Sequence, residues 1–273
     1  MKGKEVSGPW VLLTNDDGVD SPALVPLLRE LSAIVAVRAV VPATECSWTA
    51  KIMSRFERLE VEEVDREGFA VWAVSGYPAD CANLGMHTLF AEPPVLVVSG
   101  VNMGTNAGLA FLLSSGTVGA ALDGMLGGLP AAAFSVQLEG EDYARWRRHR
   151  ELTPAVAELL DNTAVVTREV VAELLAGGLP HQASLLTVNM PPSTRPETPR
   201  RLTGVTATGY GSYFTTDGEG AYRYRFSGLQ VREENARGDI AALERGEVAI
   251  TPLRFAFEVP PTAEDCQRFE RGI

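Results

Sequence analysis

Two adjacent carboxylates, Asp16 and Asp17, are the first residues in the chain whose types and spacing point to chemistry. They follow the apolar residues 11–13 and precede Gly18. Neighbouring carboxylates repel each other unless a cation lies between them, and hard cations such as Mg²⁺ prefer carboxylate oxygen. The alternative is a solvated turn in which an Asp caps the next helix, because Asn, Asp and Gly all favour turns and caps. A metal site would need further ligands from other parts of the chain.

Two such ligands, Ser47 and Asn102, follow the apolar runs 35–41 and 94–98, which we expect to be buried strands. The carboxyl ends of parallel strands meet at one edge of a sheet, so the loops after them can converge on one ion. Two carboxylates with a hydroxyl and an amide suit Mg²⁺ or Mn²⁺, and zinc is less favoured because no Cys or His accompanies them. We therefore predict one divalent cation per subunit, held by the aspartate pair with Ser47 and Asn102.

The small residues 115–119, with the sequence SGTVG, are expected to begin a helix. Free backbone N–H groups and the positive end of the helix dipole at Ser115, Gly116 and Thr117 would suit a phosphate. The alternative is a simple N-cap followed by close helix packing through Gly119. Both interpretations place this helix start at the same edge of the sheet.

Alternating strand and helix patterns would position these residues. Apolar strands are expected at 11–13, 35–41, 94–98, 131–136 and 184–190, and helices at 21–31, 81–90, 114–126 and 154–176. Residues 55–64 and 69–74 read as an exposed strand pair, and the charged residues 138–150 as an irregular segment. This order predicts an α/β fold with a Rossmann-like, doubly wound, mostly parallel sheet.

The composition changes after about residue 195, so we expect a core at 1–195 and a C-terminal extension at 196–273. Residues 200–226 alternate β-branched, aromatic and glycine residues around Thr216, Asp217 and Gly218, which predicts a projecting hairpin. A late core strand is expected at 248–253 and a terminal helix at 264–271.

The formal net charge of −11 disfavours duplex nucleic acid as a partner, although a bound cation would still allow a small phosphorylated substrate. No window approaches the roughly 18 consecutive apolar residues that a membrane helix requires. Three widely separated cysteines form no disulfide framework and fit a reducing compartment. We therefore expect a cytoplasmic protein with no membrane partner.

Four blocks occur in order at residues 15–18 (NDDG), 76–81 (GYPADC), 98–108 (VSGVNMGTNAG) and 115–121 (SGTVGAA). Together they resemble the SurE family of metal-dependent nucleotidases. Residues 185–191 and 248–253 resemble later landmarks of the same family. The resemblance implies a divalent-metal-dependent phosphomonoesterase that hydrolyses nucleoside monophosphates at the 5′ position, and it leaves the 3′ position open. It also implies that the hairpin and helix of the extension exchange between subunits to give a homodimer or homotetramer.

The resemblance also extends the expected site. The cation would coordinate a phosphate oxygen and deliver water, while Asn106, Ser115, Gly116 and Thr117 would hold the phosphate. The residues expected to take part in catalysis are Asp16, Asp17, Asn106, Ser115 and Thr117.

Several residues depart from the family pattern. Residues 42–48 read PATECSW where the family usually has PDRNQSG, and Tyr77 replaces a Thr. Trp48 and Tyr77 are candidates to stack on a nucleobase, or equally to fill space left by other substitutions. The altered loop keeps open a SurE-fold metal- and phosphate-binding protein with reduced turnover and a regulatory role. A dinucleotide-binding oxidoreductase is disfavoured because the first strand does not lead into G-x-G-x-x-G.

Overall fold

The computed structural model describes residues 8–225, 228–255 and 259–270, and a nine-stranded mixed sheet lies at its centre. The strand order is β3-β4-β2-β1-β5-β6-β7-β13-β8. In that order the strands span Val61–Arg66, Phe69–Val74, Ala36–Pro42, Trp10–Thr14, Leu96–Met103, Ala131–Val136, Leu185–Met190, Val248–Leu253 and Arg200–Leu202. Strands β4 to β7 of this order are mutually parallel, while β3 and β13 run antiparallel to β4 and β7. The predicted doubly wound, mostly parallel sheet is confirmed.

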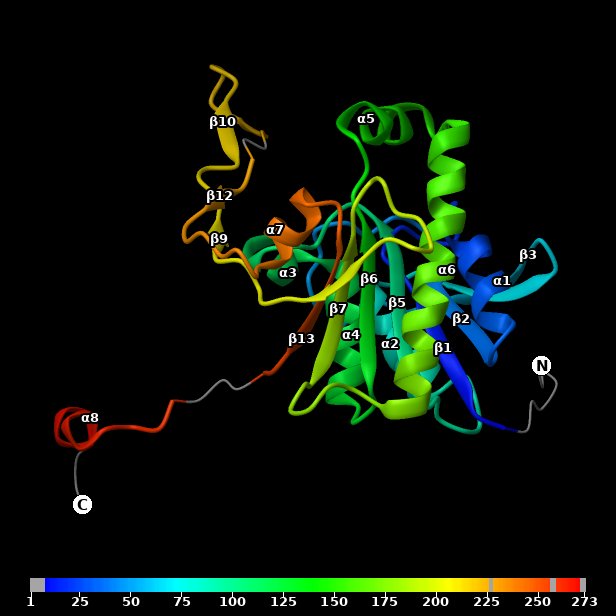
Figure 1. Cartoon of the computed structure of the whole chain (residues 1–273), viewed down its shortest axis with the longest axis horizontal. Helices are drawn as coiled ribbons and strands as arrows, with labels where there is room; N and C mark the ends of the chain where they lie inside the picture. The colour runs from blue at the N-terminus through cyan, green and yellow to red at the C-terminus, as the bar shows by residue number, and fades with distance from the viewer. Residues whose placement is uncertain (1–7, 226–227, 256–258, 271–273) are drawn as a thin grey trace.

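Helices cover both faces of the sheet (Figure 1). Helices α1 (Leu24–Ser32) and α6 (Pro154–Gly177) pack on one face, and α2 (Pro78–His87) and α4 (Gly116–Leu126) on the other. Within β1, Val11 and Leu13 join the first of these cores while Leu12 joins the second. Burial on both faces explains why the parallel strands are apolar without alternation.

The prediction that residues 138–150 are irregular is wrong, because Gly140–His149 form helix α5. This helix lies above the carboxyl edge of the parallel strands and not against a face of the sheet (Figure 1). A helix in that position needs no long apolar stripe, since Tyr143 and Trp146 line a cavity there. Only Tyr143 and Trp146 are large and apolar in α5, and the charged residues around them made this segment look irregular in the sequence.

Strand β5 also continues further than expected and includes Asn102, which was assigned to a loop. Its pairing with β6 shifts between Ser99 and Asn102. Gly100 allows this irregularity, because its φ is +125° and a Cβ there would lie 2.2 Å from the Phe134 carbonyl oxygen. Helix α1 begins at Leu24 and not at the expected Ser21.

The C-terminal part contains the hairpin predicted around Asp217, formed by β10 (Phe214–Thr216) and β11 (Tyr222–Tyr224). Figure 1 shows β10 projecting beside the carboxyl edge of the sheet and α8 (Ala263–Phe269) lying away from it. The remaining elements are α3 (Leu109–Ser114), β9 (Thr208–Gly209), β12 (Gln230–Val231) and α7 (Asp239–Glu244). The expected last residues of the hairpin and of the terminal helix, Phe226 and Arg271, lie outside the described residues.

The division into a core and an extension at residue 195 stays a prediction. Strands β8 and β13 come after that residue and still belong to the main sheet. A search of the described part of the chain finds no helix with the length and apolar character needed to cross a membrane.

Candidate active site

The order of the parallel strands reverses at β1, which has β2 on one side and β5 on the other. Open α/β sheets bind ligands at the carboxyl ends of the strands beside such a switch point. A cavity of about 780 Å³ opens there. Its lining brings together these residues predicted from the sequence: Asp16, Asp17, Ser47, Trp48, Asn102, Asn106 and Ser115.

Asp16 is almost fully buried against the start of α4. The Thr117 hydroxyl donates a 2.6 Å hydrogen bond to Asp16 Oδ1. Gly116 permits this approach, because a Cβ on it would lie 2.9 Å from the Asp16 Cβ. Gly116 and Thr117 therefore contact the Asp16 side chain, and neither is among the described residues that line the cavity.

Asp17 is fixed by the adjacent strand, since the Met103 N–H donates a 3.0 Å hydrogen bond to Asp17 Oδ2. Burial raises the pKa of Asp17 to about 8, and repulsion from Asp16 adds to the rise. Burial also raises the pKa of Asp16 to about 6, against the hydrogen bonds from Thr117. Both shifts show that two negative charges in this place are costly without a counter-charge.

The two expected neutral ligands lie on the same cavity. Ser47 Oγ donates a 2.8 Å hydrogen bond to Glu45 Oε1. Asn102 Nδ2 donates a 2.7 Å hydrogen bond to the Gly104 carbonyl, which leaves the amide oxygen as the ligating atom of that side chain. Glu45 was missed in the sequence, because it lies in a loop without periodicity. Its other oxygen accepts a 2.8 Å hydrogen bond from Arg150 at the end of α5.

This donor set fits a hard divalent cation. Two carboxylates, a hydroxyl and an amide oxygen are oxygen ligands of the kind that Mg²⁺ and Mn²⁺ accept. Within residues 8–225, 228–255 and 259–270, no group of three or more His, Cys, Asp and Glu side chains could hold a metal. A cation at this cavity would therefore depend on the aspartate pair together with neutral oxygens.

Two polar residues face the cavity beside the carboxylates. Ser115 is the N-cap of α4, and its hydroxyl oxygen accepts a 3.1 Å hydrogen bond from the Val118 N–H, as the capping alternative predicted. The hydroxyl hydrogen remains able to donate to a bound anion. Asn106 is buried, and its side-chain Nδ2 donates a 2.7 Å hydrogen bond to Ser135 Oγ. One Nδ2 hydrogen of Asn106 is left for a ligand.

The two aromatic residues expected to contact a base, Trp48 and Tyr77, lie in different places. Trp48 lines the cavity, whereas Tyr77 is the N-cap residue of α2 and is absent from the described lining. Four further aromatic side chains line the same cavity and were not identified as site residues from the sequence: Phe111, Tyr143, Trp146 and Tyr224. They come from α3, α5 and β11, so only the folded chain brings them together.

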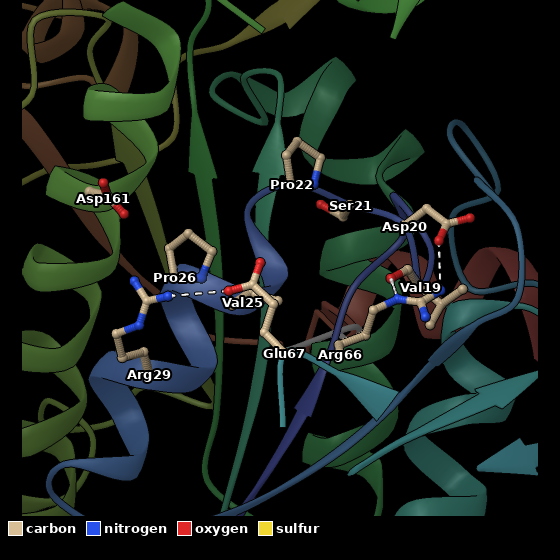
Figure 2. A pocket seen from close by; sticks show the side chains of 10 residues that line it. All are labelled: Val19, Asp20, Ser21, Pro22, Val25, Pro26, Arg29, Arg66, Glu67 and Asp161. Atoms are coloured by element: carbon tan, nitrogen blue, oxygen red, sulfur yellow. Dashed lines mark hydrogen bonds and ion pairs between the residues drawn. The ribbon is translucent and has the colours of Figure 1, made fainter. Parts of the chain in front are cut away.

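A second, smaller cavity of about 400 Å³ is lined by residues of the segment before α1, of α1, of α6 and of the β3–β4 turn (Figure 2). Figure 2 shows its two arginines facing carboxylates, with Arg66 bound to Asp20 at 2.6 Å and Arg29 bound to Glu67 at 3.5 Å. Since both guanidinium groups are paired in this way, this cavity is less suited to a phosphate than the larger one.

The fold and the site define an α/β protein with a doubly wound sheet and a carboxylate-bearing, oxygen-lined pocket at its switch point. The chain belongs to the SurE family, because the family model described as "Survival protein SurE" matches residues 11–215.

The chain is similar to known proteins over most of its length. A protein named 5′-nucleotidase SurE from Methanoculleus marisnigri is 34% identical, covering 97% of this chain and 98% of that protein. A protein of the same name from Methanocella arvoryzae is 32% identical, covering 89% and 91%. The crystal structure of a SurE protein from Aquifex aeolicus matches with a TM-score of 0.74 at 26% identity, covering 95% of this chain and 97% of that one.

Proposed function

We propose that this protein is a phosphomonoesterase that hydrolyses nucleoside 5′-monophosphates with the help of one divalent cation, with nucleoside 3′-monophosphates as the alternative substrates to be tested. The observation that carries the proposal is the convergence of Asp16, Asp17, Ser47 and Asn102 on one cavity at the switch point of the sheet. The relatives named 5′-nucleotidase SurE support the same reaction class.

Asp16, Asp17, Ser47 and Asn102 would hold the cation, with Mg²⁺ or Mn²⁺ preferred by the oxygen donor set. When bound, such a cation polarises a phosphate oxygen and lowers the pKa of a coordinated water. The chain prepares the two carboxylates in advance, because Thr117 orients Asp16 and the Met103 N–H orients Asp17.

The phosphate would lie between the aspartate pair and the start of α4. Ser115 donates its hydroxyl hydrogen and Asn106 its second Nδ2 hydrogen to phosphate oxygens, which stabilises the negative charge of the transition state. Preorganised donors of this kind are the main protein contribution to phosphoryl transfer. We propose that Thr117 contributes to catalysis through Asp16, because its hydroxyl is already used there.

We also propose that the C-terminal extension joins copies of the chain into a homodimer or homotetramer. Helix α8 has no buried residue, and Phe269 is 70% exposed. A cytoplasmic location is supported by Cys46, Cys81 and Cys266, which are all free thiols. Light scattering of the full chain and of a chain ending at residue 255 tests the role of α8, since the shorter chain should form assemblies with fewer subunits.

The experiment that tests the activity is phosphate release from nucleoside 5′- and 3′-monophosphates in Mg²⁺, Mn²⁺ or EDTA. We expect cation-dependent release, reduced at least about 100-fold in Asp16→Asn. Asp161→Asn is the matched control, because Asp161 is an exposed carboxylate on α6 outside the larger cavity. A folded protein that binds Mn²⁺ and releases no phosphate would contradict the proposal and favour a binding protein of the same fold.

A further inference from the structure

Five aromatic side chains share a cavity with the aspartate pair: Trp48, Phe111, Tyr143, Trp146 and Tyr224. They come from the loop after β2, from α3, from α5 and from the hairpin strand β11. We call this set the aromatic recess. The carboxylates are largely buried, whereas Trp48, Tyr143 and Tyr224 are each more than a third exposed. The aspartate pair therefore lies deeper in the protein than these three rings.

Trp48 is at the centre of the contacts between these rings. Its ring meets Phe111 edge to face at a centroid distance of 5.7 Å, with an angle of 87° between the ring planes. It meets Tyr213 at 5.5 Å and Tyr224 at 6.1 Å, also edge to face. Rings that stand nearly perpendicular form a corner, in which a planar ring can stack on one wall and present its edge to the next.

The backbone of Trp48 is unfavourable for a bulky residue. Its φ is +63°, in the left-handed region that glycine occupies without cost. The Trp48 side chain is 46% exposed, so its burial offsets only part of the cost of this backbone conformation. Residues with a strained backbone are held in place by the surrounding structure, and they cluster at active sites and ligand clamps. The left-handed backbone of Trp48 and the 46% exposure of its side chain beside the aspartate-lined cavity are two observations that point to a ligand there.

We propose that the aromatic recess binds the planar base of the nucleotide and that Trp48 is the specificity-determining residue; this rests on the proposed function of the same cavity. Every base can stack on an aromatic side chain, because every base has a π-face. A larger base offers more area for this stacking. The order of substrate preference is therefore purine nucleotides first, pyrimidine nucleotides second, and ribose 5-phosphate last. The hairpin contributes to the site through Tyr224, so the C-terminal extension takes part in substrate selection.

The test compares AMP, UMP and ribose 5-phosphate as substrates of the full chain and of Trp48→Gly and Trp48→Phe. We expect Trp48→Gly to raise KM for AMP about tenfold with little change in kcat, and to leave ribose 5-phosphate unaffected. Trp48→Phe should retain most of the AMP affinity. Tyr224→Ala should raise KM for AMP, whereas Tyr222→Ala is the matched control, because Tyr222 lies on the same strand and is absent from the described lining.

A structural role for Trp48 gives a different result. If Trp48→Gly weakens AMP and ribose 5-phosphate equally, the residue acts on the neighbouring Ser47 and the proposal is overturned. Aromatic side chains also bind trimethylammonium groups. Faster hydrolysis of phosphocholine than of AMP would therefore show that the recess binds such a cation and not a base, and would overturn the proposal.

Adenosine binding separates this proposal from the phosphatase proposal. Adenosine carries no phosphate, so its affinity, measured by calorimetry in the presence of Mg²⁺, reports on the recess even in a protein without turnover. Binding that weakens about tenfold in Trp48→Gly supports the recess whatever the activity. Equal binding to both proteins overturns it.

Discussion

The Thr117 hydroxyl and Asp16 Oδ1 are 2.6 Å apart, so the start of α4 is tied to the loop after β1 across 101 positions of sequence. Residues that orient a metal ligand typically affect metal affinity or activity by about 10- to 100-fold when they are replaced. We therefore expect Thr117→Val to weaken Mn²⁺ binding and to lower kcat/KM by a factor in that range. Isothermal calorimetry and initial rates measure the two quantities.

Thr163→Val is the control for Thr117→Val, because the Thr163 hydroxyl is equally buried but donates to the Leu160 carbonyl within α6. This variant should keep the Mn²⁺ affinity of the parent. Equal metal affinities of Thr117→Val and the parent protein would show that the Thr117 hydroxyl does not orient Asp16.

Gly116 offers a second test of the same junction. An alanine Cβ at this position would lie 2.9 Å from Asp16 Cβ and 3.0 Å from Asp16 Oδ2. Helix α4 has little freedom to retreat, because a Cβ at Gly119 would already lie 2.0 Å from the Ala50 carbonyl oxygen. Gly116→Ala should therefore displace the carboxylate and lower kcat/KM by about tenfold or more.

The matched control for Gly116→Ala is Gly177→Ala at the end of α6, where nothing lies within 4 Å of an added Cβ. Its rate should match that of the parent, and its Tm should be equal or slightly higher, because Ala favours the helix more than Gly does. Full activity of Gly116→Ala would mean that Asp16 tolerates displacement at this contact.

The sequence predicted the parts of the site that follow from strand order. Apolar runs indicate β1, β2 and β5 as buried strands, and parallel strands end at one edge, so the sequence alone places Asp17, Ser47 and Asn102 together. What the sequence did not predict depends on contacts between distant segments. The link from Thr117 to Asp16 and the link from Glu45 to Arg150 leave no local pattern.

Helix α5 shows that the prediction of secondary structure from the sequence is limited in a similar way. The periodicity of apolar residues marks a helix only where one face packs on a core, as α6 does. In α5 only Tyr143 and Trp146 are large and apolar; both line the cavity and Trp146 also packs against the core, but the charged residues around them suggested an irregular segment. The aromatic recess was not predicted from the sequence for this reason, since two of its five side chains, Tyr143 and Trp146, belong to α5.

The raised pKa values of the aspartate pair predict how stability depends on pH. Without a cation, the folded protein holds protons on Asp16 to about pH 6 and on Asp17 to about pH 8, whereas a model Asp has a pKa of 3.8. Between these values the folded state binds more protons than the unfolded chain, so the free energy of unfolding falls as pH rises. In EDTA, Tm should therefore decrease from pH 5 to pH 8.

Asp17→Asn isolates this contribution, because it removes the carboxyl with the larger shift and keeps a side chain of similar shape. Its Tm in EDTA should fall less between pH 5 and pH 8 than that of the parent. Mg²⁺ should stabilise the parent more at pH 8, where protons no longer compete for the carboxylates. An identical pH dependence of parent and variant would contradict the assigned pKa of Asp17.

Arg150 and Glu45 give the last prediction. Arg150 ends α5 and pairs with Glu45 at 2.8 Å, while the other Glu45 oxygen accepts the Ser47 hydroxyl. Arg150→Ala removes a positive charge near the cavity and loosens the loop that carries Ser47, so KM for a nucleotide dianion should rise. The Arg150 side chain is 53% exposed, and exposed ion pairs are weak, so we expect only about a two- to fivefold increase.

Salt separates the two causes of that increase. A purely electrostatic effect of Arg150→Ala should shrink in 0.5 M KCl, because exposed charges are screened over a few ångströms at that ionic strength. A change in loop order would persist. Arg148→Ala removes the same charge from an exposed position of the same helix, so a KM increase of equal size in both variants would assign the effect to net charge and not to the Arg150–Glu45 pair.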